Sequence, residues 1–235
     1  MIQLIINEFK KIGLIKIILS FIMFLIVIIF IYEFNDDMED TIFKLIPFVG
    51  IMTSILFSGI ISNEIEQGTF RFYLTKPISR KKIFQSKLLT IIIYNIGLLT
   101  YIFYIYMVLC KNIDKYCFVK YVKYSSSLLI IDSLIILLST IIRNTSVTVG
   151  ITISLLTFGL LITQLLFDIK MKFIEYTFLP YLDFSVFDDK EILLMMNRVY
   201  NINLSLKNGV IINIVYSYLF YLIGNNIFIK KDIKN

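Results

Sequence analysis

Histidine is absent from the 235-residue chain, and its absence excludes several catalytic classes. A Ser-His-Asp triad, an intramembrane Ser-His dyad and an H-E-x-x-H zinc site each need an imidazole. No glycine is followed by lysine, so the chain also lacks the Walker A sequence that cradles nucleotide phosphates. We therefore expect a protein that is not an enzyme and holds no metal or cofactor. If ATP drives it, another polypeptide binds that ATP.

Charge is scarce as well: charged residues make up 17% of the chain and apolar residues 58%, with a mean hydropathy of +0.83. Soluble domains contain about 45–50% apolar residues, so a soluble globule could not bury this composition. Barrel strands would show an alternation that is absent here. The sequence predicts an all-α, polytopic membrane protein, one domain over residues 1–235, whose runs long enough to cross a membrane as helices are 13–31, 42–61, 88–110, 125–142, 145–167 and 209–229.

Six transmembrane helices place both termini on one side, and flanking Lys and Arg residues indicate which side. The segments expected inside are rich in basic residues, whereas the first outer loop is acidic between Glu33 and Asp40. One loop disagrees, since four lysines between 111 and 123 would lie outside. We expect both termini to be cytoplasmic. The net charge of +6 then follows from contact with anionic membrane lipids, and no nucleic acid is needed as a partner.

Two features flank this core. Apolar residues recur at helical spacing in residues 1–12 opposite a polar face with Glu8 and Lys11, which predicts an interfacial amphipathic helix. The first span is too long for a signal peptide, so we expect it to stay in the mature protein. Cys110 and Cys117 would both lie outside, where a disulfide and two unpaired packing residues fit equally well.

The most informative stretch is a dense polar island between the second and third spans, residues 63–87, here called the coupling region. Asn63 and Glu66 have the spacing of a helix N-cap and its third residue, Gly68 offers a flexible joint, and Ser79 is placed to cap the third span. Charges of both signs stand beside bulky apolar residues such as Phe72. Just before it, small residues at 50, 54, 58 and 62 form a stripe for close helix packing, within this chain or with a second copy.

The spacing Glu64-x-Glu66-x-Gly68-Thr69, followed by Pro77 and Lys87, resembles the cytoplasmic signature of ABC-2 type permeases, the membrane subunits of ATP-driven exporters. The tight turn with Arg143-Asn144 after the fourth span is similar to their pattern too. The resemblance implies a type V exporter-like fold with a cytoplasmic coupling helix that seats in the ATPase subunit. The residues that it assigns to ATPase coupling are Glu64, Glu66, Gly68, Thr69, Phe72, Pro77, Arg80 and Lys87.

Two further features fit this pattern. Asp132 lies within the fourth span, where an acid is costly, so it is either a candidate pathway residue or a structural hydrogen-bonding group. Residues 168–208 form an aromatic-rich outer segment, and the resemblance implies that it is an extracellular re-entrant gate loop, although an interfacial aromatic belt fits it as well.

The resemblance implies a plasma-membrane permease subunit of a bacterial exporter. Its partners would be two copies of an ATPase subunit, which bind ATP and Mg, a second permease, identical or related, and membrane lipids. The small size is closest to permeases for bacitracin resistance or lantibiotic immunity, so an amphiphilic peptide or lipid-like cargo is expected. One alternative is a permease for sodium or polysaccharide, although a carbohydrate channel would favour tryptophan, which is absent. Another is a non-transporting protein that binds or senses an antimicrobial peptide.

Overall fold

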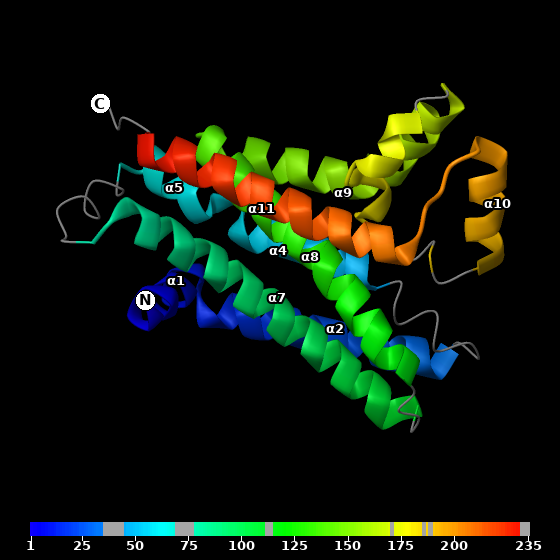
Figure 1. The fold of residues 1–235 in the computed structure, drawn as a ribbon. Coiled ribbons are helices and arrows are strands. Elements are labelled where there is room, and N and C mark those ends of the chain that lie inside the picture. Colours follow the sequence, from blue (N-terminus) through cyan, green and yellow to red (C-terminus); the bar gives the residue numbers. More distant parts are fainter. Residues whose placement is uncertain are drawn as a thin grey trace.

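The fold is a bundle of long helices, and the described residues contain no strand. A computed structural model describes residues 1–34, 45–68, 78–110, 115–169, 172–184, 187 and 190–230. The α-helices are α1 (Ile2–Ile12), α2 (Leu14–Phe34), α4 (Ile46–Phe57), α5 (Gly59–Glu66), α7 (Arg80–Cys110), α8 (Lys115–Ile141), α9 (Thr145–Asp168), α10 (Lys190–Tyr200) and α11 (Leu206–Lys230), and two 3-10 turns are η1 (Lys172–Tyr176) and η2 (Leu179–Tyr181) (Figure 1).

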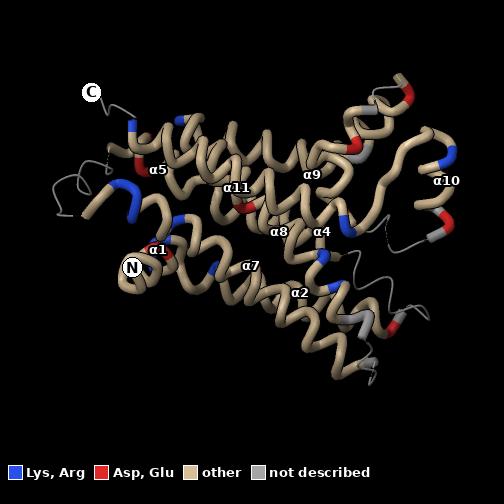
Figure 2. The backbone as a smooth tube through the Cα atoms, viewed as in Figure 1, with Lys and Arg blue, Asp and Glu red and all other residues tan. Residues whose placement is uncertain are grey.

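Among the residues that the structure describes, five helical segments are long and apolar enough to cross a membrane, and α9 makes a sixth if its two halves, bent by 55° after Gly159, count as one span. The prediction of an all-helical, multi-pass membrane protein is confirmed to this extent. The helices α7 and α8 begin earlier than expected, at Arg80 and Lys115, because both continue through polar residues. Charged residues gather at the two ends of the bundle, and few lie between them (Figure 2).

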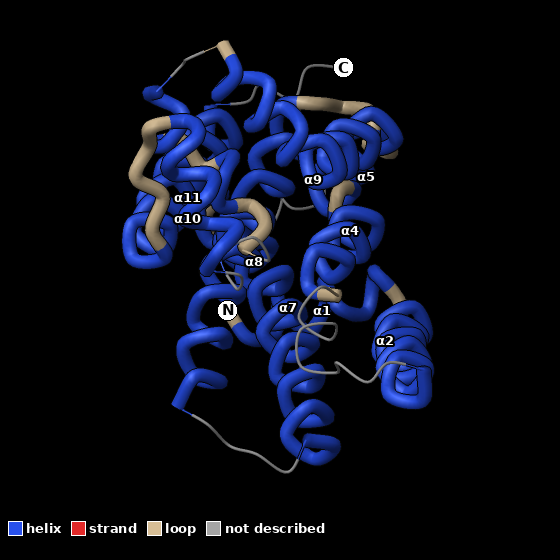
Figure 3. Tube along the Cα trace, turned by 90° about the vertical axis from the view of Figure 1, so that its right-hand side faces the viewer, coloured by secondary structure: helices blue, strands red, loops and turns tan. Residues whose placement is uncertain are grey.

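The helix α8 is the centre of the bundle. In its most apolar window 72% of the residues are buried, compared with 17% in α2 and in α11. Seen along the bundle in Figure 3, α2 and α11 lie on opposite sides. Their exposed faces are apolar, with Ile15, Ile18 and Leu19 on α2 and Ile211, Ile214 and Tyr218 on α11. In a bilayer these faces meet lipid, where apolar exposure carries no penalty.

The two ends of the bundle differ. The helix α1, the end of α5, the start of α7 and the end of α11 meet at one end, which we call the coupling end (Figure 1). The first and last helices thus share one end, as an even number of spans requires. The opposite end, called the loop end, carries η1, η2 and α10, and α10 runs across the bundle direction. Which end faces the cytoplasm remains a prediction.

The predicted interfacial helix is present as α1. Gly13 follows it with a φ of +95°, a left-handed conformation that glycine adopts without strain. The chain therefore changes direction there, and α1 lies at the coupling end instead of prolonging α2 (Figure 1). Its apolar residues Phe9 and Ile12 pack against the buried core.

Candidate functional site

Four charged side chains from three elements meet at the coupling end, and we call them the charge cluster: Glu8 and Lys11 of α1, Glu64 of α5 and Lys87 of α7. The ammonium of Lys11 lies 3.2 Å from Glu8 Oε1 and 2.6 Å from Glu64 Oε1. The ammonium of Lys87 lies 3.1 Å from Glu8 Oε2 and 2.9 Å from Glu64 Oε2. Each carboxylate thus bridges both lysines.

The inner half of the cluster is largely buried. The side chain of Lys87 is 0% exposed, and those of Glu8 and Glu64 are 4% and 10% exposed. Lys87 donates hydrogen bonds to Glu8 Oε2 at 3.1 Å and to the backbone carbonyl of Ile60 at 2.8 Å, whereas its contact with Glu64 Oε2 is an ion pair without a hydrogen bond. Buried charges are tolerated only when they are paired and hydrogen-bonded. All four charges of the cluster are paired here, although the buried Glu64 Oε2 has an ion pair and no hydrogen bond.

Lys11 forms the outer half, with 45% of its side chain exposed. Partial burial by itself lowers the pKa of Lys11, but the hydrogen bond to Glu64 and the negative charges of Glu64 and Glu8 outweigh it. The pKa of Lys11 is therefore raised above its ordinary value. The lysine stays charged throughout the physiological pH range, as the balance of the cluster requires.

The small-residue stripe explains how α5 reaches this position. Gly50, Ser54, Ser58 and Ser62 are all buried, and a Cβ on Gly50 would lie 2.9 Å from Ile131 Cδ1 of α8. The stripe therefore packs within this chain.

At the short interruption between α4 and α5, Ser139 Oγ of α8 accepts hydrogen bonds from Ile61 N (3.1 Å) and Ser62 N (3.0 Å). First-turn amides have no partner in their own helix, so Ser139 compensates for the interruption.

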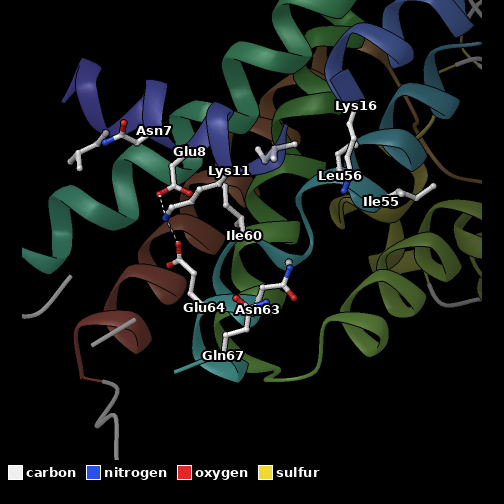
Figure 4. Close-up of a pocket in the computed structure, with 13 residues that line it drawn as sticks. Asn7, Glu8, Lys11, Lys16, Ile55, Leu56, Ile60, Asn63, Glu64 and Gln67 are labelled. Carbon is white, nitrogen blue, oxygen red and sulfur yellow. Dashed lines mark hydrogen bonds and ion pairs between the residues drawn. The ribbon is translucent and has the colours of Figure 1, made fainter. Parts of the chain in front are cut away.

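A groove of about 940 Å³ lies beside the cluster, between α1, the first turn of α2 and α4–α5. Glu8, Lys11 and Glu64 form part of its wall (Figure 4). The rest of the wall combines amides, one more lysine and apolar side chains: Asn7, Asn63, Gln67, Lys16, Leu4, Ile12, Ile55, Leu56, Gly59 and Ile60.

These positions correct two expectations. Glu64 and Lys87 cannot form a docking surface, because both are buried against α1. Asn63 does not begin a helix either. The helix α5 starts at Gly59 and runs through Asn63 to Glu66, since the buried residues before Asn63 continue the helical packing on α8. Asn63 and Glu66 instead accept hydrogen bonds from Thr145 Oγ1, at 2.6 Å and 3.2 Å, which ties α5 to the start of α9.

Of the other residues assigned to coupling, Gly68 and Arg80 are described by the structure and three are not. Gly68, just past the end of α5, has a φ of +68°, and apart from its chain neighbours no atom of the described residues lies within 4 Å of where its Cβ would be. Its backbone conformation therefore favours glycine. Arg80, the first residue of α7, donates from Nη1 to the carbonyl of Ile229 at 2.8 Å and so joins α7 to the end of α11. Thr69, Phe72 and Pro77 lie outside the described residues.

Asp132 is almost fully buried in α8 and accepts a hydrogen bond from Asn95 Nδ2 of α7. Asn95 Oδ1 in turn accepts from Thr53 Oγ1 of α4 at 2.6 Å. The chain of hydrogen bonds links three spans. This hydrogen bond fits the structural role considered for Asp132, with Asn95 of a neighbouring helix as the partner. A pathway role remains a prediction.

At the loop end, Tyr181, Leu182 and Phe184 are buried between α8, α9 and α11. The backbone carbonyls of this segment accept hydrogen bonds from the spans: Asn213 Nδ2 donates to Tyr181 at 2.9 Å, and Ser127 Oγ donates to Leu182. Gly209 makes the approach feasible, since a Cβ there would lie 2.4 Å from Tyr181 Cδ1. The segment therefore packs into the end of the bundle. Its role as a gate is not tested by this packing. The side chains of Cys110 and Cys117 are outside the described set.

Sequence reasoning missed the contributions of Glu8 and Lys11, which it assigned to the polar face of α1. The sequence carried one local signal, since Glu8 and Lys11 stand one helical turn apart, the spacing of an ion pair on a helix. It also missed Asn95, which stands between Tyr94 and Ile96 and carries no motif, and the contact of Ser139 with α5.

A family model described as "Protein of unknown function (DUF2705)" matches residues 32–234. Two similar proteins are both from Bacillus subtilis (strain 168). One, an uncharacterized protein called YhcI, is 25% identical over 211 residues, which cover 79% of this chain and 65% of that protein. The other, an uncharacterized membrane protein called YdbK, is 23% identical over 201 residues, or 78% of this chain and 77% of that protein. The match thus spans less than two thirds of the first relative's length.

Proposed function

The chain belongs to the DUF2705 family, and we propose that it is the membrane permease subunit of an ATP-driven ABC-2 type exporter. It would form the translocation pathway, pair with a second permease and receive motion from two ATPase subunits, which bind the ATP and Mg. An amphiphilic peptide antibiotic or a lipid-like compound is the proposed cargo, so the protein would serve resistance or self-protection in the bacterial plasma membrane. Both ends of the chain would then be cytoplasmic.

The charge cluster is the observation that carries this proposal. A transporter without its own nucleotide site needs a stiff element that passes the movement of the ATPase to the spans. Residues 69–77 are preceded by α5 and followed closely by α7, and the cluster fixes both helices to α1 through buried ion pairs. The hydrogen bond of Arg80 connects α7 to α11, and the hydrogen bond of Thr145 connects α5 to α9. A force applied between α5 and α7 would therefore reach most of the bundle.

The revised role of Glu64 and Lys87 fits the same proposal. They would hold the coupling region internally, while the exposed Glu66 and Gln67 remain available to a partner beside Gly68. The second candidate function, a non-transporting protein that binds or senses an antimicrobial peptide, rests on the exposed aromatic side chains Phe173 and Tyr176 at the loop end. A peptide-binding function at the loop end would not require the charge cluster at the coupling end.

The test is purification of the full chain from native membranes in mild detergent, followed by mass spectrometry of the proteins bound in stoichiometric amount. We expect a P-loop ATPase. Glu66→Lys and Gly68→Val should each reduce its binding or its cargo-stimulated ATP hydrolysis by at least about tenfold, because one reverses an exposed charge and the other strains a left-handed residue by about 1–3 kcal/mol. Both variants should stay in the membrane.

The matched control is Glu33→Lys, the same charge reversal on an exposed residue at the loop end of α2. It should leave the ATPase bound. Recovery of the chain alone, or with a partner that lacks a P-loop, would refute the permease proposal and favour the peptide-binding protein. Unchanged transport in both Glu66→Lys and Gly68→Val would refute the coupling assignment.

A further inference from the structure

The exposed half of α9 is divided lengthwise into an apolar edge and a polar edge. The apolar edge consists of residues that a lipid-facing helix exposes without penalty: Val147, Ile151, Phe158, Ile162 and Leu165. The polar edge, here called the polar strip, consists of small or polar residues with one leucine among them: Ser146, Gly150, Ser154, Thr157, Leu161 and Gln164. Within each edge the residues recur at intervals of three, four or seven, so each edge follows one side of the helix.

The polar groups of the strip differ from those on the buried side of α9. The buried Thr148 and Thr152 donate to the backbone carbonyls one turn earlier, at 3.0 Å and 2.9 Å. In contrast, the amide of Gln164 makes no hydrogen bond to any residue that the structure describes, and the hydroxyl of Ser154 makes none either. An amide that faces hydrocarbon without a partner is costly. The strip therefore indicates a surface that lipid does not cover.

The depth of the strip excludes a simple contact with headgroups. Ser154 lies nine residues after the start of α9, about 13 Å along the helix, and farther still from its end. A hydroxyl on a single carbon cannot reach either boundary of a hydrocarbon core about 30 Å thick from there. Its partner must lie within the membrane.

The chemistry of the strip fits a second copy of the same chain. No charged residue lies between Ser146 and Gln164, so two strips do not repel each other. A glutamine amide has both donors and an acceptor, and it is therefore complementary to another glutamine amide. Two copies related by a two-fold axis along the spans bring equivalent residues to the same depth. Gly150 and Ser154 also allow two helices to approach closely.

We propose that the polar strip of α9 is the contact surface for a second copy of this chain. In this interface the Gln164 amides of the two copies hydrogen-bond to each other, and Ser154 of each copy lies against α9 of the other. The apolar edge of α9 stays in contact with lipid. The inference deepens the proposed pairing with a second permease and rests on it to that extent, but it needs no ATPase.

The first experiment is disulfide cross-linking of the full chain in vesicles of phosphatidylethanolamine and phosphatidylglycerol, with Cys110→Ser and Cys117→Ser as the background. Ser154→Cys replaces one oxygen by sulfur on the strip, and we expect a covalent dimer on mild oxidation. Ile151→Cys is the matched control, because it places a thiol about one turn away on the apolar edge. It should form at most a background level of dimer.

A second measurement uses the association of donor-labelled and acceptor-labelled chains, followed by energy transfer as the vesicles are diluted with lipid. Gln164→Leu should weaken the association about tenfold, the effect of about one interhelical hydrogen bond in a membrane. Ile162→Leu, a change of similar size on the apolar edge, should leave the association unchanged.

Three results would overturn the interface. They are equal cross-linking of Ser154→Cys and Ile151→Cys, unchanged association in Gln164→Leu, and rapid labelling of Ser154→Cys by a membrane-impermeant thiol reagent, which would assign the strip to a water-filled pathway. Failure of the permease proposal is recognised separately. Specific cross-linking in a chain that recovers no ATPase would support the interface and refute the permease, whereas an ATPase recovered with a chain that does not cross-link would refute the interface alone.

Discussion

Replacing Lys87 with methionine is the most direct perturbation of the charge cluster. Methionine keeps an unbranched side chain of similar length but removes the ammonium, which is in contact with Glu8, Glu64 and the carbonyl of Ile60. The variant would leave two nearly buried carboxylates that share one remaining lysine. We expect Lys87→Met to destabilise the protein strongly while leaving the apolar packing of α7 in place.

The magnitude follows from the geometry. Removing one partner of a buried ion pair costs about 3–5 kcal/mol, because the other charge stays buried and uncompensated. Lys11 remains in contact with both acids but is 45% exposed, so its attraction is screened and offsets only part of that loss. We expect a net loss of about 3 kcal/mol. For a chain of this size, 1 kcal/mol corresponds to roughly 2–4 °C in melting temperature, so the expected decrease is about 6–12 °C.

The assay is thermal unfolding in mild detergent, followed by loss of the folded, monodisperse fraction. Lys82→Met on the exposed side of the same helix is the control and should shift the melting temperature by less than about 2 °C. In the double variant Glu64→Gln/Lys87→Met one acid and one lysine remain, so most of the loss should be recovered. A Lys87→Met variant as stable as the Lys82→Met control would refute the cluster as a buried, balanced unit.

Two further outcomes are expected. Asp132→Asn should retain the contact to Asn95 and change stability by less than about 1 kcal/mol, whereas Asp132→Leu leaves the Asn95 amide unsatisfied and should cost about 1–3 kcal/mol in the same assay; equal effects of the two would contradict the structural role. Burial first, and then the charges of Glu175 and Tyr176, raises the pKa of Tyr181 to about 12. Because the folded state keeps this proton longer, stability should be intact below about pH 10 and fall as the pH rises toward 12, and Tyr181→Phe should remove this dependence.

The presence of the spans could be predicted because hydropathy over a membrane-long window is a local property of the sequence. Their ends could not. The first turn of α7 contains Arg80, Lys81 and Lys82, and hydropathy excludes these charged residues from a span. The helix nevertheless begins at Arg80, directly after Ser79, because charge does not prevent helix formation outside the apolar core of a membrane. The interfacial helix was predictable for the same local reason, since its period of apolar residues lies within residues 1–12.

The charge cluster was beyond local reasoning. Lys11 and Glu64 are 53 residues apart, and Lys87 and Glu8 are 79 apart, so no spacing rule joins them. The motif resemblance assigned Glu64 and Lys87 to contact with an ATPase subunit, whereas the structure buries both. A charge in a signature stretch can serve a partner or the fold equally well. Only the position of α1, set by the turn at Gly13, shows that these two serve the fold.

The cluster also bears on how the chain enters the membrane. Lys11 and Lys87 are among the positive charges that would hold their segments on the cytoplasmic side while the helices are inserted one after another. Before α7 is in place, Lys87 must be hydrated, and Lys11 has only Glu8 of its own helix and Glu64 as partners. Once α7 arrives, Lys87 is withdrawn from water and neutralised by Glu8 and Glu64, whereas Lys11 stays partly exposed. Two lysines would thus first help to set the orientation of the helices during biogenesis and afterwards stabilise the assembled bundle through ion pairs.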